Sequence, residues 1–185
     1  IINDIYQTFD GEDVYNSIEE KAANFLYMII KNLIDEDFSN YKECAMFIGF
    51  PHCTFKCEKD CGCIGMCQNS QLMTSPDIDI SCSNIVNRYI KNPLSRAVVF
   101  GGLEPFDDFE DLLTLVQFFR METDDDIVIY TGYYADEIIE QIRKLKRYKN
   151  IVIKFGRFIP NQESRYDNVL GVNLASKNQY ATRIS

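Results

Sequence analysis

Four short apolar segments, rich in β-branched and aromatic residues, constrain the fold of this chain most strongly. They are CAMFIGF at 44–50, SRAVVFGG at 95–102, DIVIYTG at 126–132 and NIVIKFG at 150–156. Segments with helical periodicity separate them, at 82–92, 105–120 and 134–148. Continuous apolar strands that alternate with helices are typical of a parallel sheet covered on both faces. The pattern therefore predicts an α/β fold, and 185 residues is a suitable length for a single such domain.

The N-terminal part has a different pattern. The stretch SIEEKAANFLYMIIKNLI at 17–34 predicts an amphipathic helix, because Ser17 and Glu20 are spaced as a capping box. Its apolar residues recur at helical spacing, at Ile18, Ala22, Phe25, Ile29 and Leu33. We therefore expect a helical N-terminal extension over residues 1–40 and the main domain over residues 41–185.

A cluster of cysteines follows the first predicted strand. Five of the seven cysteines lie between positions 53 and 67. An odd number of cysteines in a chain of this length argues against a disulfide scaffold and favours a metal site in a reducing, cytoplasmic compartment. Zinc would use two short-spaced pairs of thiolates, and an iron–sulfur cluster would use three or four. The spacing alone leaves both open.

Three of the predicted strands end in segments that differ from ordinary turns. The cysteine loop follows the first strand, GGLEP at 101–105 ends the second, and YTGY at 130–133 ends the third. Parallel sheets bind ligands at the carboxyl ends of their strands, which lie on one edge. We therefore expect the three segments to converge on one rim.

Taken in order, the segments FIGFPHCTFKC, MCQN, FGGLEPF and YTGY resemble the radical S-adenosylmethionine (SAM) family. More narrowly, they resemble the small activating proteins of anaerobic ribonucleotide reductases, as does the ending ASKNQYAT. The resemblance covers residues 35–182 and implies a partial (β/α) barrel with a [4Fe–4S] cluster held by three thiolates. The fourth iron would chelate SAM, and reduction of SAM would yield a 5′-deoxyadenosyl radical.

The cysteine spacing departs from that of the family. Cys53 and Cys57 keep the first family gap, but the third family position is Asp60. The run Cys67-Gln68-Asn69 matches the end of the motif, as if seven residues had been inserted before it. The resemblance therefore implies Cys53, Cys57 and Cys67 as cluster ligands, and Cys61 and Cys63 are rivals for the third position.

The resemblance also implies the residues that bind SAM. The backbone at Gly101 and Gly102 would approach the methionyl group, and Glu104 would accept a hydrogen bond from its amino group. An extra residue, Leu103, separates this glutamate from the glycines. The other implied contacts are made by Asn69, Pro105, Tyr130, Thr131, Gly132 and Lys154.

The function implied by the resemblance is that of a glycyl-radical-enzyme activase. Its partner would be an anaerobic ribonucleotide reductase, and its electron donor a flavodoxin or ferredoxin. The small size of the chain favours this function, because little of it is left to enclose a substrate. Two alternatives are a non-catalytic iron–sulfur or zinc module on a degenerate fold, and a radical enzyme that acts on a peptide or small molecule.

Charge and hydropathy exclude other classes of partner. The formal net charge of −9 repels phosphate backbones, so we expect no nucleic-acid partner. No stretch approaches the roughly 20 continuous apolar residues that span a bilayer, so no membrane partner is expected either.

Overall fold

The computed structural model describes residues 8–9, 12–13 and 26–185. Its centre is a six-stranded sheet with the order β12-β9-β8-β7-β5-β4. The four apolar segments form its parallel core: β5 (Ala45–Phe50), β7 (Ala97–Gly102), β8 (Asp126–Tyr130) and β9 (Ile151–Phe155). The edge strands β4 (Asn32–Asp37) and β12 (Tyr180–Arg183) pair antiparallel with β5 and β9. The sheet is therefore mixed.

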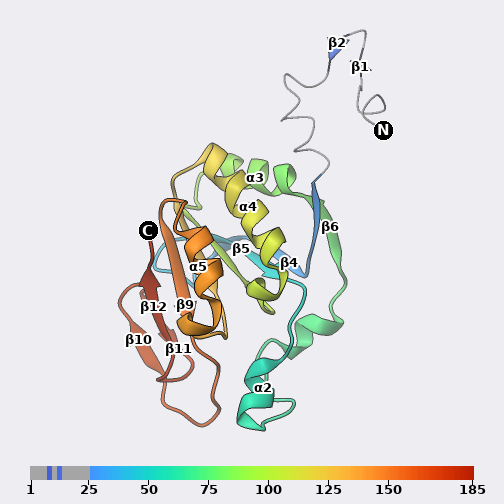
Figure 1. Cartoon of the computed structure of the whole chain (residues 1–185). Helices are drawn as coiled ribbons and strands as arrows, with labels where there is room; N and C mark the ends of the chain where they lie inside the picture. The colour runs from blue at the N-terminus through green and yellow to red at the C-terminus, as the bar shows by residue number, and fades with distance from the viewer. Residues whose placement is uncertain (1–7, 10–11, 14–25) are drawn as a thin grey trace.

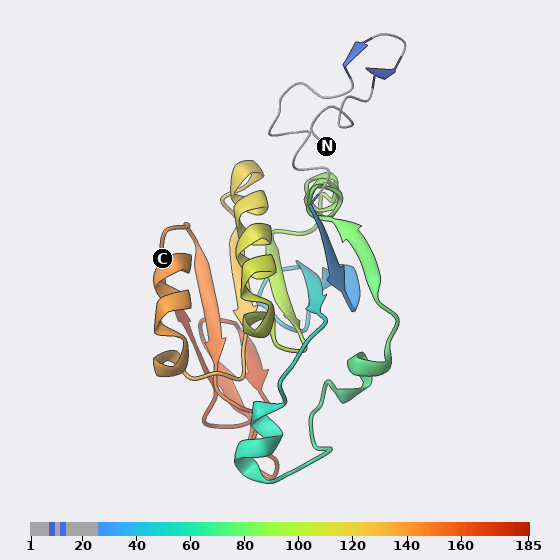
Figure 2. The same ribbon diagram turned by 45° about the vertical axis from the view of Figure 1, so that its right-hand side comes forward.

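Three helices cover one face of this sheet (Figures 1 and 2). They are α3 (Cys82–Lys91), α4 (Phe109–Glu122) and α5 (Ile139–Leu145). Their buried side chains join one cluster with alternate strand residues such as Val98 and Phe100, as the period of two in a strand requires. Phe119 packs at its centre, with its ring centroid 5.4 Å from Tyr89 and 6.0 Å from Phe100.

The opposite face of the sheet has a smaller core, and none of the helices among the described residues contributes to it. Small strand residues such as Ala45, Ala97 and Val99 pack there against Leu170 and Leu174. Leu174 belongs to a hairpin of β10 (Arg165–Asp167) and β11 (Val172–Leu174). The helix-free face therefore leaves room beside the hairpin for a cavity at the carboxyl ends of the strands.

The expected N-terminal helix is wrong over residues 27–34. This stretch contributes β3 (Tyr27–Ile30), which pairs with β6 (Ile78–Ser81), and the first part of β4. Met28 and Ile30 are buried while Tyr27 and Ile29 are exposed, which is a strand pattern. The four apolar residues YMII fit both the helical period of 3.6 residues and the strand period of two. Pairing with β6 selects the strand. Residues 17–25 of the predicted helix lie outside the described residues.

The remaining elements are short. β1 (Thr8–Phe9) and β2 (Glu12–Asp13) form an antiparallel pair near the N-terminus. Turns of 3₁₀ helix occur at η2 (Ser70–Thr74), η3 (Pro105–Asp108) and η4 (Ala135–Ile138), and the last two lead into α4 and α5. Within the described residues, no helix combines the length and apolar character needed to cross a bilayer.

Candidate functional site

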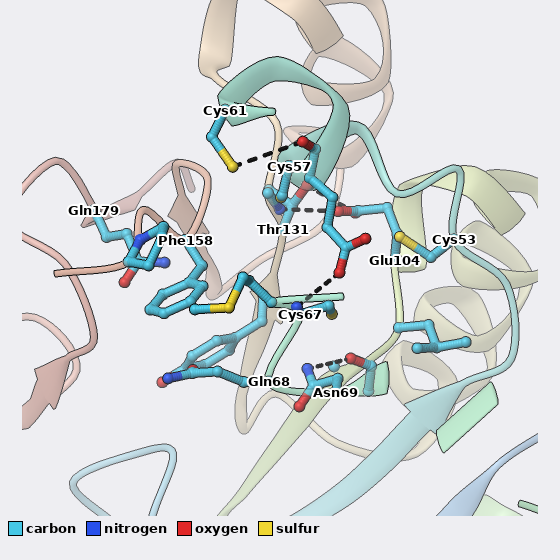
Figure 3. A pocket seen from close by; sticks show the side chains of 18 of the residues that line it. Cys53, Cys57, Cys61, Cys67, Gln68, Asn69, Glu104, Thr131, Phe158 and Gln179 are labelled. Carbon is cyan, nitrogen blue, oxygen red and sulfur yellow. Dashed lines mark hydrogen bonds between the residues drawn. The ribbon is translucent and has the colours of Figure 1, made fainter. Parts of the chain in front are cut away.

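The carboxyl ends of β5, β7 and β8 surround a cavity of about 280 Å³ (Figure 3). It lies on the helix-free side of the sheet, because Phe47 and Tyr130 of its wall pack against the smaller core. Most of the predicted site residues line it: Cys53, Cys57, Cys67, Asn69, Gly101, Gly102, Glu104, Tyr130, Thr131 and Gly132. The cysteine loop, GGLEP and YTGY therefore meet at one cavity.

Two predicted residues lie outside this lining. Pro105 is buried at the start of η3. Lys154 is buried on β9, where its Nζ donates to the Gly156 carbonyl at 3.0 Å. Burial lowers the pKa of Lys154 to about 8, against the opposing effect of the nearby Glu104 carboxylate. The ammonium group lies 5.9 Å from the centre of the ring of Tyr130, which is part of the cavity wall.

All five clustered cysteines line the cavity. Burial raises the pKa of Cys53 to about 12 and also raises the pKa of Cys57. These thiols therefore hold their protons until a metal displaces them. Among the described residues, no three His, Cys, Asp or Glu side chains are grouped closely enough to hold a single ion. The thiols are instead distributed around the wall of the cavity.

Gly132 makes room for one of these thiols. A Cβ atom at this position would lie 2.6 Å from Cys57 Sγ, which is far inside van der Waals contact. The backbone of Gly132 does not have a positive φ, so its lack of a side chain is explained by this contact. A thiol held in a cradle at the end of β8 is suitable as a ligand of a metal group in the cavity.

Gly102 has a different structural reason to be glycine. Its φ is +83°, and a Cβ atom there would lie 2.7 Å from Gly49 Cα on the neighbouring strand. Its carbonyl accepts a hydrogen bond from Asn69 Nδ2 at 2.6 Å. The second glycine of GGLEP therefore allows the turn after β7 and connects it to the end of the cysteine loop.

Glu104 joins the GGLEP and YTGY segments through a buried carboxylate. Oε1 accepts hydrogen bonds from Thr131 Oγ1 at 2.7 Å and from the Phe106 N–H at 3.2 Å, and Oε2 accepts from the Gly132 N–H at 2.8 Å. Burial raises the pKa of Glu104 to about 7, although these three donors lower it. The carboxylate thus already has three protein partners at the wall of the cavity.

Further residues, which sequence reasoning missed, fasten the cysteine loop. Asp107 accepts a hydrogen bond from the Thr54 N–H and another from Tyr133 Oη, both at 2.6 Å. The adjacent Asp108 pairs with His52 Nδ1 at 2.6 Å. The sequence signal for Asp107 and Asp108 is their position shortly after the Glu-Pro of GGLEP, where they also fit the first turn of a helix. The loop is therefore attached to η3 on both sides of Cys53.

An ion-pair network fastens the other end of the loop. α2 (Lys56–Cys61) carries Asp60, whose Oδ2 lies 2.6 Å from Arg157 Nε. Arg157 also donates to both carboxylate oxygens of Glu137, at 2.8 and 2.6 Å, and its side chain is 7% exposed. The hydrogen bonds from Arg157 hold the pKa of Glu137 at about 2. The carboxylate of Asp60, which stands at the third family position, is therefore paired with the Arg157 guanidinium.

A family model described as "4Fe-4S single cluster domain" matches residues 41–180. The chain therefore belongs to this family and is an iron–sulfur protein, which favours a [4Fe–4S] cluster over zinc at the cysteine-lined cavity. No curated protein and no solved structure matches the chain.

Proposed function

We propose that this protein is a radical SAM enzyme that activates a glycyl-radical enzyme, with its sheet as the partial barrel of that fold. The observation that carries the proposal is the convergence of the cysteine loop, GGLEP and YTGY on one cavity. A lone [4Fe–4S] domain needs only its cysteines. The two other motifs at the same rim are what a second ligand, SAM, would require.

In this proposal Cys53, Cys57 and Cys67 hold the cluster, which supplies one electron for the cleavage of bound SAM. The chain's own residues position and shield the reactants. Tyr130 is held as part of the wall by the hydrogen bond from its hydroxyl to the Asn40 carbonyl, at 2.6 Å. A methyl group at Gly101 would overlap the Phe47 ring at 2.9 Å, so this glycine keeps the floor of the cavity flat.

An adjoining cavity is the observation that favours a peptide as the substrate. It measures about 320 Å³ and shares Asn40, Phe47, Gln68, Asn69 and Gly102 with the first cavity. Its remaining wall is mostly polar, with Asn32, Asp37, Ser39 and Gln71 beside Ile34 and Leu72. Side-chain amides can pair with the backbone of an extended chain. We propose that a glycine-bearing segment of anaerobic ribonucleotide reductase enters here, in the cytoplasm, with a flavodoxin or ferredoxin as electron donor.

One observation favours a second candidate, a non-catalytic iron–sulfur module. Glu104, which the family resemblance assigns to the amino group of SAM, already accepts three internal hydrogen bonds. In a module without catalysis this carboxylate has only the structural task of joining β7 to β8.

Cleavage of SAM separates the two candidates. The protein is reconstituted anaerobically with iron and sulfide, reduced with dithionite and given SAM. We expect methionine and 5′-deoxyadenosine in equal amounts, and none from a Cys57→Ala variant treated in the same way. A confirmed cluster without cleavage would favour the non-catalytic module. If cleavage occurs, adding candidate partners and recording a glycyl radical by electron paramagnetic resonance (EPR) tests the activase role.

A further inference from the structure

The insert in the cysteine loop raises the question of how a third thiol reaches the cluster. At the regular family position, Asp60 lies against Arg157, which is nearly buried and also carries Glu137. Among the described residues, loss of Asp60 would leave Glu137 as the one remaining ion-pair partner of this nearly buried guanidinium, which costs stability. The Asp60 side chain therefore holds the end of α2 against Arg157. We infer that the third ligand comes from a residue beyond this helix.

Directly after α2 the chain turns back on itself. Gly62, with φ +66°, ends the helix, and Gly65, with φ +82°, makes the second bend. The Cys63 N–H donates to the Glu58 carbonyl at 3.1 Å, so the insert starts its return along the helix that it has just left. Both bends use positive φ angles, which glycine adopts at no steric cost.

The Glu58 side chain closes this insert. Its Oε1 accepts a hydrogen bond from the Cys67 N–H at 2.7 Å, and its Oε2 accepts one from the Gly65 N–H at 2.9 Å. Glu58 directly follows Cys57, so one carboxylate connects the second predicted ligand to the third. Hydrogen bonds to an ionised carboxylate are stronger than those between neutral groups.

The two rival thiols have partners inside the insert. Cys61 Sγ donates to the Glu58 carbonyl at 3.6 Å, and Cys63 Sγ donates to the Cys61 carbonyl at 3.2 Å. The tip of the insert is strongly exposed, with Ile64 88% accessible to solvent. Cys67, by contrast, lies on the return side of the loop, beyond both bends, where Glu58 binds its backbone.

We propose that Glu58 is a positioning residue that brings Cys67 to the cluster as its third ligand, across an insert that the Asp60–Arg157 pair makes necessary. The inference rests on the cysteine assignment in the proposed function, but not on SAM cleavage. It concerns the loading and retention of iron, and a non-catalytic module would need Glu58 as much as an enzyme would.

The test counts iron and measures its loss to a chelator. Reconstituted Glu58→Ala should lose its visible absorption to excess chelator at least tenfold faster than wild type. Glu58→Gln keeps one acceptor oxygen and should lie between the two, and it serves as the variant to measure if alanine does not fold. Glu110→Gln, a change at an exposed glutamate on α4, should match wild type.

A double variant separates positioning from general stability. Cys67→Ala should lower the iron content strongly in the wild-type background and add little to Glu58→Ala, because the two residues act through one ligand. The proposal is overturned if Glu58→Ala keeps iron as long as wild type does, or if Cys67→Ala keeps its full cluster. A protein that holds iron as predicted but leaves SAM intact would contradict only the proposed enzyme activity.

Discussion

Replacing Cys57 by alanine should leave the anaerobically reconstituted protein colourless and nearly free of iron. Cys57 lies in the cradle formed by Gly132 and lines the cavity together with Cys53, which Figure 3 shows beside Glu104. Cys61 and Cys63 also line the cavity, but their thiols donate to backbone carbonyls of the loop. Asp107 and Arg157 hold this loop in place, so replacing the Cys57 thiolate would require the loop to move. Iron and sulfide analysis measures the loss, and Cys53→Ala should behave in the same way.

The matched control for this experiment is Cys44→Ala. Cys44 lies just before β5, and its thiol is 3.9 Å from Ser95 Oγ, outside the lining of the cavity. This variant should keep the iron content of wild type. A Cys57→Ala protein that still holds a full cluster would show that the ligands lie elsewhere in the loop, with Cys61 and Cys63 as the first residues to test.

A single methyl group at position 132 should be almost as damaging to the cluster. In Gly132→Ala the new Cβ atom would lie 2.6 Å from Cys57 Sγ, so the thiol must move away from its present position. Because the backbone of Gly132 has no positive φ, alanine itself is compatible with the fold. We expect less than half the iron of wild type, with the thermal unfolding midpoint of the iron-free protein nearly unchanged.

Gly102→Ala provides the contrast. Here φ is +83° and the new Cβ atom would lie 2.7 Å from the backbone of Gly49, so the expected effect is on stability. The unfolding midpoint of the iron-free protein should fall clearly below that of wild type. If Gly132→Ala destabilised the iron-free protein as much as Gly102→Ala and kept its iron, the cradle for Cys57 would have no role in cluster binding.

The centre of the fold was predictable because its signals are local. Runs such as AVVF and IVIK contain continuous β-branched or apolar residues, and the helices between them have a clear apolar face, so the positions of β7, β9 and α4 follow from periodicity. Tyr27–Ile30 carries an ambiguous pattern, and its strand conformation depends on pairing with β6, which is distant in the sequence. Long-range pairing of this kind leaves no periodic signal.

The location of the candidate site was predictable from the sequence, but the contacts that hold the cysteine loop in place were not. The positions of the three motifs after strands were enough to expect one rim, and Cys53, Glu104 and Gly132 all line one cavity. The residues that hold the loop were not predictable. Asp60 with Arg157 and Thr54 with Asp107 are single contacts between distant segments, and charged residues at such positions resemble ordinary solvated ones.

An EPR spectrum of the reduced, reconstituted protein, recorded with and without SAM, tests directly whether a [4Fe–4S] cluster in this cavity binds SAM. If Cys53, Cys57 and Cys67 are the three ligands, as proposed, one iron of the [4Fe–4S] cluster would have no protein ligand and would be open to the amino and carboxylate groups of SAM. We expect a signal from the reduced cluster whose shape changes when SAM is added. A spectrum that stays the same at saturating SAM, or an iron-free protein that holds one equivalent of zinc, would contradict this expectation.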